Sequence, residues 1–278
     1  MNNKFILEFQ QVSYTYPLTQ QPALDGLNIR LPRGKKCALL GQNGCGKSTM
    51  LLLADGLLRS YTGKILVANQ PINYNRKYLQ ELRKKIGLVF QDPEQQLVAP
   101  TVNEDISYSL YNLGLPETEI KQRVKAIITD FDLENLAEKP VHHLSLGQKK
   151  RVALAGVMVL QPELLLLDEP TAYLDPLQQR NLITELETIH ATGTTILIAT
   201  HDLDLAYEWA DWIFVMHQGK LIIEGEAHEV FCHKEILENL HLGVPLLWDI
   251  WQALPNSLRE IVGISAPRNV QEFRQRLG

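Results

Sequence analysis

The sequence has few cysteines and no long apolar segment. Its three cysteines, Cys37, Cys45 and Cys232, are odd in number and show no CxxC spacing, which argues against a disulfide framework or a cysteine metal site. Reduced thiols are the simplest interpretation. No apolar run approaches the roughly 20 residues that cross a bilayer, and the start MNNKFILEFQQ lacks the apolar core of a signal peptide. Any work at a membrane is therefore expected to be peripheral.

Basic charge is not in excess either. The 278 residues contain 27 Lys and Arg against 32 Asp and Glu, which gives a net charge of −5. A nucleic-acid-binding surface needs a basic surplus, so we expect no nucleic-acid partner. Hydrophobic residues make up 45% of the chain, enough for a sizeable core in one large domain or two ordinary ones.

Short strand-like runs alternate with helix-like runs, which predicts an α/β fold. The apolar runs Leu164–Leu167 and Thr195–Ala199 are continuous rather than alternating, as in parallel strands that are covered on both faces. The expected strands are residues 7–14, 35–41, 65–69, 87–91, 164–168, 194–200, 212–219 and 220–225. Between Asp92 and Gly147 helical patterns replace the strands, which predicts a helical subdomain, about 92–147, inserted in the α/β core.

A phosphate-binding loop follows the second expected strand. The pattern Gly-x-x-x-x-Gly-Lys-Ser lies between a strand and a helix that begins at Lys47, which is the context that this loop requires. Its backbone N–H groups would surround the β-phosphate, Lys47 would reach the β- and γ-phosphate oxygens, and Ser48 would bind Mg²⁺. The predicted nucleotide contacts are Gly41, Asn43, Gly44, Cys45, Gly46, Lys47, Ser48 and Thr49.

Cys45 occupies a special position within this loop. It precedes a helix N-terminus, where the partial positive charge lowers a thiol pKa and favours the thiolate. We therefore expect a reactive thiol at Cys45.

Two acidic residues end the apolar run Leu164–Leu167. Asp168 would lie at the carboxyl edge of a strand, where open α/β sheets bind ligands, and would hold Mg²⁺. Glu169 would orient and polarise the water that attacks the γ-phosphate. Two acids after a strand are often only a solvated loop, but a phosphate-binding loop upstream favours a metal ligand and a general base.

Three other side chains have both a functional and an ordinary interpretation. His201, just past the strand 194–200, could contact the γ-phosphate or be structural. Gln91, at the end of 87–91, could contact Mg²⁺ and the attacking water or be merely solvated. Tyr16 could stack on an adenine ring or pack locally.

A second phosphate-binding element appears in LSLGQKKR, Leu144 to Arg151. Apolar residues at mostly helical spacing follow it, so Ser145 and Gly147 lie at the start of a helix, where backbone N–H groups attract anions. The phosphate-binding loop far upstream is already complete. The second element therefore raises the question of whose phosphate it binds.

Together these motifs resemble the ATP-binding subunits of ABC transporters. The phosphate-binding loop, Gln91, LSLGQ, LLLLDEP, Leu174-Asp175 and His201 occur in that family's order, and the similarity covers roughly residues 5–231. The resemblance implies a P-loop NTPase core with a mostly parallel sheet, an N-terminal antiparallel β subdomain and an inserted helical subdomain. It also implies ATP and Mg²⁺ as cofactors.

The resemblance further implies that LSLGQ serves a second subunit. In this family the motif of one subunit caps the γ-phosphate held by the other, which assigns Ser145, Gly147 and Gln148 to a nucleotide in trans. Asp175 would communicate between the two sites. Leu146 stands where the family usually has glycine.

A finer resemblance concerns the segment QDPEQQLVAPTVNEDISYSLYNLGLP and LSLGQKKRVALAG. Both are similar to the ATPases of energy-coupling-factor importers, most of all the cobalt and nickel branch. The implied partners are a second ATPase subunit, identical or a close paralogue, a membrane-spanning permease and a substrate-binding membrane component. The implied location is peripheral, on the cytoplasmic face of the cell membrane. Alternatives are an importer ATPase for a vitamin, or a soluble ABC ATPase acting on nucleic acid or ribosomes.

The C-terminal end is expected to be an extension, 243–278, of an ATPase domain formed by 1–242. In it Leu247, Trp248, Trp251 and Leu254 fall on one helical face. This face either packs on the chain's own domain or contacts a partner.

Overall fold

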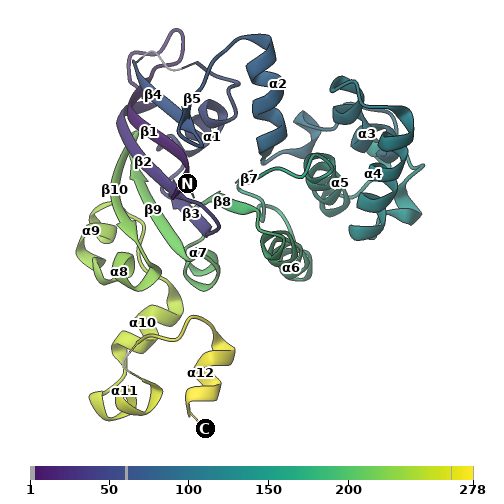
Figure 1. The fold of residues 1–278 in the computed structure, drawn as a ribbon. Coiled ribbons are helices and arrows are strands. Elements are labelled where there is room, and N and C mark those ends of the chain that lie inside the picture. Colours follow the sequence, from purple (N-terminus) through teal and green to yellow (C-terminus); the bar gives the residue numbers. More distant parts are fainter. Residues whose placement is uncertain (1–3, 60–61, 264, 278) are drawn as a thin grey trace.

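Two β-sheets organise the chain in the computed structural model, which describes residues 4–59, 62–263 and 265–277 (Figure 1). The smaller sheet has the strand order β2-β1-β4-β5, and its neighbours are all antiparallel. Its strands are β1 (Phe5–Tyr14), β2 (Leu24–Pro32), β4 (Thr62–Val67) and β5 (Gln70–Pro71). The expected N-terminal antiparallel sheet is therefore confirmed.

The larger sheet has the order β10-β9-β3-β8-β7-β6 and is parallel except for the β9–β10 pair. Its strands are β3 (Lys36–Leu40), β6 (Ile86–Val89), β7 (Leu164–Asp168), β8 (Thr195–Thr200), β9 (Trp212–His217) and β10 (Lys220–Gly225). Every residue of β8 is buried, as is β7 up to Leu167. Burial on both faces explains why these strands read as continuous apolar runs.

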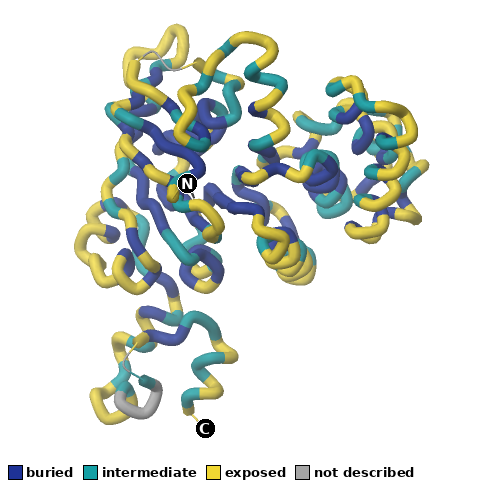
Figure 2. The backbone as a smooth tube through the Cα atoms, in the orientation of Figure 1, coloured by how far each residue is buried: buried dark blue, intermediate teal, exposed yellow. Residues whose placement is uncertain are grey.

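The two faces of the larger sheet contribute to two separate hydrophobic cores. Along β7, Leu165 and Leu167 belong to one core, whereas Leu164 and Leu166 belong to the other. The alternation follows from the two-residue period of a strand. Figure 2 shows the resulting buried strands at the centre of the molecule. Both faces are therefore covered, and the carboxyl ends of the strands are left as the accessible edge.

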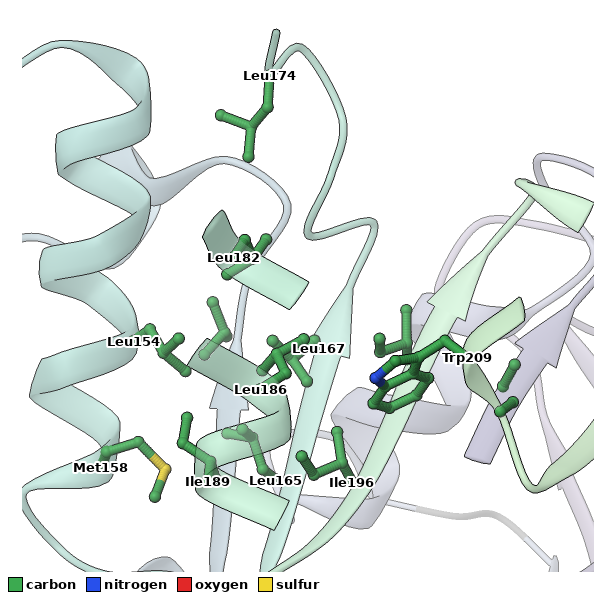
Figure 3. Close-up of a cluster of buried hydrophobic side chains, with 14 of the residues drawn as sticks. Leu154, Met158, Leu165, Leu167, Leu174, Leu182, Leu186, Ile189, Ile196 and Trp209 are labelled. Atoms are coloured by element: carbon green, nitrogen blue, oxygen red, sulfur yellow. The ribbon is translucent and has the colours of Figure 1, made fainter. Parts of the chain in front are cut away.

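Helices cover the larger sheet and form a separate lobe. On the core that contains Leu167, Leu154 of α5 and Leu186 of α6 lie together against the sheet (Figure 3). The helices up to this region are α1 (Lys47–Ala54), α2 (Arg76–Lys85), α3 (Val102–Asn112), α4 (Glu117–Asp130), α5 (Leu146–Met158), α6 (Pro176–Ala191) and α7 (Leu203–Trp209). Short 3₁₀ helices are η1 (Pro93–Gln95), η2 (Glu134–Leu136) and η3 (Val141–His143).

The expected helical insertion is visible as helices α3 and α4, which stand apart from the two sheets in Figure 1. Helix α5 contacts both of them and strand β6. The bounds 92–147 stay a prediction. Between residues 91 and 163, all of them described, the chain forms helices and turns with one isolated bridge, Thr101 to Pro140. Helix α3 starts with a capping box in which Thr101 and Glu104 satisfy each other's backbone N–H groups. Local capping thus defines the start of the lobe.

The C-terminal region packs on the chain itself through Trp248. The remaining helices are α8 (Ala227–Cys232), α9 (Lys234–Asn239), α10 (Leu246–Ala253), α11 (Asn256–Val262) and α12 (Val270–Leu277). The Trp248 ring is 3% exposed and lies 5.9 Å from the Tyr207 ring and 6.5 Å from the Phe231 ring, centroid to centroid. Of the two interpretations of this face, the structure bears out packing on the chain's own domain. The division at residue 242 stays a prediction.

Over the described residues, no helix combines the length and apolarity needed to span a membrane.

Candidate nucleotide-binding site

The loop between β3 and α1 has a backbone that only its glycines allow easily. Gly44 and Gly46 have φ angles of +80° and +108°, a region that side chains rarely tolerate. A Cβ atom on Gly46 would lie 2.5 Å from the carbonyl oxygen of Ala23. The loop therefore needs glycine at Gly46 for conformation and for close packing.

Lys47 begins α1 and folds back over this loop. Its Nζ donates to the carbonyl oxygen of Gly41 at 2.6 Å and to that of Gln42 at 3.3 Å. The side chain is 6% exposed, and Nζ lies 3.8 Å from Oε1 of Glu169. The ammonium thus sits between the loop and the carboxylate of the predicted base, where an incoming phosphate would meet it.

Asp168 and Ser48 meet beside the loop. Burial raises the pKa of the Asp168 carboxyl, and a hydrogen bond from Ser48 partly offsets that rise. Gln91 lines the same pocket, so the residues around it carry carboxylate, hydroxyl and amide oxygens, the hard donors that Mg²⁺ prefers. No group of three or more His, Cys, Asp or Glu gathers in the described part of the chain. The residues fit Mg²⁺.

Glu169 is held in place from several directions. Its carboxylate accepts from Oγ1 of Thr200 at 3.2 Å, and Oε1 lies 2.9 Å from Nδ1 of His201. Its backbone N–H donates to the carbonyl of Ala199 at 2.8 Å. The Glu169 residue is 7% exposed, whereas 62% of the His201 side chain is exposed. A buried carboxylate beside an accessible imidazole suits activation of a water at the pocket edge.

One pocket of about 470 Å³ brings most of the predicted residues together. Its lining includes Tyr16, Asn43, Gly44, Gly46, Lys47, Ser48, Thr49, Gln91, Asp168 and Glu169. The Tyr16 hydroxyl lies 3.2 Å from Oγ1 of Thr49, which places the ring beside the phosphate-binding loop. The lining also includes Thr19 and residues 21–23, which the sequence did not single out because they match no motif.

Gly41 and Cys45 lie behind the pocket rather than on its surface. Gly41 contributes its carbonyl to Lys47, and a Cβ there would lie 2.5 Å from Sγ of Cys45. The Cys45 side chain is 5% exposed and belongs to a hydrophobic core. Burial raises its pKa, and this outweighs the opposing influence of Lys47 and of nearby backbone N–H groups. The expectation of a reactive thiolate at Cys45 was therefore wrong.

The second phosphate-binding element lies outside this pocket. Ser145 caps α5: its Oγ accepts from the N–H of Gln148 at 3.3 Å, and its own N–H donates to Oε1 of Gln148 at 2.9 Å. A Cβ on Gly147 would lie 2.8 Å from the Gln178 side chain of α6. Asp175 caps α6 by accepting from the N–H groups of Leu177 and Gln178, both at 2.9 Å. The structure thus groups Ser145, Gly147 and Gln148 with the start of α6.

Comparison with known proteins shows the family of the chain. Residues 24–172 match the family described as ABC transporter. A protein of Nostoc sp., named as an ABC transporter ATP-binding protein, is 54% identical over 272 residues, 98% of this chain and 97% of that protein. The energy-coupling factor transporter ATP-binding protein EcfA of Methanocaldococcus jannaschii is 44% identical over 241 residues, 87% of this chain and 86% of its own length.

A solved structure is also similar. CbiO1 of Clostridium perfringens, part of the ABC transporter complex CbiONQ, has a TM-score of 0.74 and 44% identity. The similarity covers 86% of this chain and 95% of CbiO1. The chain therefore belongs to the ABC transporter family, as an ATP-binding domain that hydrolyses ATP.

Because Cys45 is buried, we expect it to react slowly with a maleimide at neutral pH. Cys232 is exposed, whereas Cys37 and Cys45 are buried with raised pKa values, so Cys232 should react first and the other two only after denaturation. Mass spectrometry of the labelled peptides measures the order, and Cys232→Ser should abolish the fast phase. Rapid labelling of Cys45 in the native protein would contradict the buried position.

Proposed function

We propose that this chain is the ATPase subunit of an energy-coupling-factor importer for cobalt or nickel ions. It dimerises around two ATP molecules with Mg²⁺ and drives a membrane permease from the cytoplasmic face of the membrane. The observation that carries the proposal is the joint placement of Lys47, Asp168 and Glu169 in one pocket, with the LSLGQ element outside it. The relatives named as energy-coupling factor proteins and the CbiO1 likeness support the importer over a soluble ATPase acting on nucleic acid.

Within one subunit the residues divide the work on ATP. The loop N–H groups and Lys47 bind the β- and γ-phosphates, and Tyr16 stacks on the adenine. Ser48, Asp168 and Gln91 would hold Mg²⁺, which would supply positive charge to neutralise the phosphate oxygens. Glu169 holds the attacking water and accepts its proton, while His201 contacts the γ-phosphate.

The second subunit supplies what a single chain lacks. Hydrolysis needs the γ-phosphate charge neutralised on the side opposite the phosphate-binding loop. Ser145, Gly147 and Gln148 provide a second helix N-terminus for this purpose, and they lie away from their own chain's pocket. A closed two-fold dimer places each such element over the partner's ATP. Asp175, next to it in space, links the two sites.

The groove beside Gln91 to Leu97 is the proposed contact with the permease. Gln96 braces it: its Oε1 accepts from the N–H of Phe90 at 3.0 Å, and its Nε2 donates to the carbonyl of Ala153 at 3.2 Å. A pocket of about 310 Å³ lies here, with Val98 and Tyr108 exposed on its rim. The groove touches both the α/β core and the helical lobe, so movement at Gln91 can reach a partner seated in it.

The role of Glu169 can be tested by Glu169→Gln. The amide keeps the size of the side chain but cannot accept a proton, so turnover should fall by about 10²-fold or more. ATP binding should persist, and the trapped ATP should hold two subunits together in size-exclusion chromatography. Glu163→Gln, just before the opposite end of β7, is the matched control and should remain active. Near-normal turnover of Glu169→Gln would remove Glu169 from this role.

Mixed dimers test whether LSLGQ acts in trans. Lys47→Ala should weaken ATP binding and Ser145→Arg should block the cap with bulk, so each homodimer should be nearly inactive. In a mixed dimer one site carries both lesions, but the other combines an intact loop with an intact cap. ATPase activity should therefore return to a fraction of wild type. Mixed dimers that form and bind ATP without hydrolysing it would contradict the trans assignment, as would an active Ser145→Arg homodimer.

Uptake by intact cells tests the cargo. Replacing the wild-type chain by Glu169→Gln should abolish uptake of radiolabelled cobalt or nickel ions, because the importer loses its ATPase cycle, while Glu163→Gln should support it. Normal metal uptake together with lost uptake of a vitamin would contradict the metal cargo and retain the importer ATPase.

A further inference from the structure

Lys150 is a buried lysine on helix α5 that contacts the loop following the predicted base. It is 5% exposed, and its Nζ donates to the carbonyl oxygens of Pro170 at 2.8 Å, Ala172 at 2.9 Å and Glu169 at 3.4 Å. An ammonium has three N–H donors, and here they have three backbone acceptors. One short loop, 19 to 22 residues further along the chain, therefore satisfies all three donors of Lys150.

The loop that Lys150 holds carries an uncommon backbone conformation. Glu169 and Tyr173, both non-glycine, have φ angles of +43° and +63°. Such conformations persist only where the surrounding contacts over-determine them. Those contacts include the Glu169 N–H bond to Ala199, a bond from Gln179 Nε2 to the carbonyl of Leu174 at 3.1 Å, and the three bonds from Lys150. Because the backbone at Glu169 aims its carboxylate, the lysine acts on the base through the main chain.

The charge of Lys150 suits the same task. Burial lowers its pKa to about 8, while the carboxylates of Glu169 and Asp92 oppose the decrease. At neutral pH the ammonium form prevails and retains all three donors. The neighbouring Lys149 differs, because its ammonium pairs with Glu94 of η1 instead of the loop. The two adjacent lysines thus provide a matched pair for comparison.

We propose that Lys150 is a positioning residue that sets the carboxylate of Glu169 for hydrolysis and ties it to helix α5. This inference rests on the proposed role of Glu169. Because the N-terminus of α5 serves the partner's ATP, each Lys150 joins the base of its own site to the cap of the other. In a dimer, the side chain of Lys150 would therefore connect the two ATP sites.

Lys150→Met tests the proposal in the full-length protein, since methionine keeps the apolar stem and removes the donors. The turnover number should fall by about 10- to 100-fold, as expected when a catalytic group is displaced by about 1 Å. ATP affinity should stay unchanged, because the loop at Lys47 is untouched. Lys149→Met should keep wild-type turnover, and Lys150→Arg should restore part of the activity. Lys150→Gln, which is shorter and leaves at least one of the three carbonyl oxygens without a donor, is the substitute if Lys150→Met does not fold. Turnover of either folded variant within about twofold of wild type would overturn the proposal.

The mixed dimer shows on which element Lys150 acts. Its one competent site uses the Glu169 of the Ser145→Arg chain and the cap of the Lys47→Ala chain. Lys150→Met in the Ser145→Arg chain should remove the restored activity, whereas in the Lys47→Ala chain it should not. Equal loss from both chains would overturn the positioning of Glu169, since it would mean a general effect on α5 packing.

The experiments distinguish a failure of the proposed role of Glu169 from a failure of the proposed role of Lys150. An active Glu169→Gln protein would refute the proposed base, whatever Lys150→Met does. A dead Glu169→Gln protein beside a fully active Lys150→Met protein would refute this inference alone. If mixed dimers show no activity, the trans assignment fails, and the homodimer comparison of Lys150→Met with Lys149→Met still decides the role of Lys150.

Discussion

Strand β8 pairs with β3 on one side and with β7 on the other, and the site depends on this pairing. The register places Leu40 beside Thr200 and Asp168 beside Ala199. In a parallel sheet the carboxyl ends of neighbouring strands leave at the same edge. The phosphate-binding loop follows β3, Asp168 ends β7 with Glu169 directly after it, and His201 follows β8. These groups therefore meet at this edge although they are far apart in sequence.

Glu169 lies between two buried lysines, which hydrogen-bond to different loops. Lys47 faces its carboxylate and binds carbonyls of the phosphate loop, whereas Lys150 binds the carbonyl side of the same residue from helix α5. Both lysines are nearly inaccessible, and each has backbone acceptors that compensate for its burial. Thr200 and His201 complete the surroundings of the carboxylate. A carboxylate fixed in this way has little orientational freedom left to lose when a ligand binds.

Cys45 illustrates where local reasoning failed. Proximity to a helix N-terminus does favour a thiolate, and the backbone N–H groups of Lys47 and Cys45 do lower the thiol pKa, but the Cys45 side chain lies in a hydrophobic core. Desolvation then dominates. Strand β2 and helix α2 were missed for related reasons: β2 is interrupted by polar residues on its exposed face, and Leu82 is the one buried residue of α2. Elements with few apolar residues are stabilised by tertiary contacts, and local sequence patterns do not reveal which contacts these are.

The sequence by itself determined the class of the fold and predicted the chemistry of the site. Glycines at Gly44 and Gly46, the order of motifs and the uninterrupted apolar strands are local properties, and they predicted the loop, the acidic pair and a sheet buried on both faces. Only the tertiary structure decided which distant groups share a pocket, that Cys45 is buried and that Trp248 packs on its own domain. Only the tertiary structure showed that Lys150 contacts the carbonyl oxygens of Glu169 and Pro170. A contact between a helix and a strand end depends on packing in three dimensions, which the local pattern of one sequence does not specify.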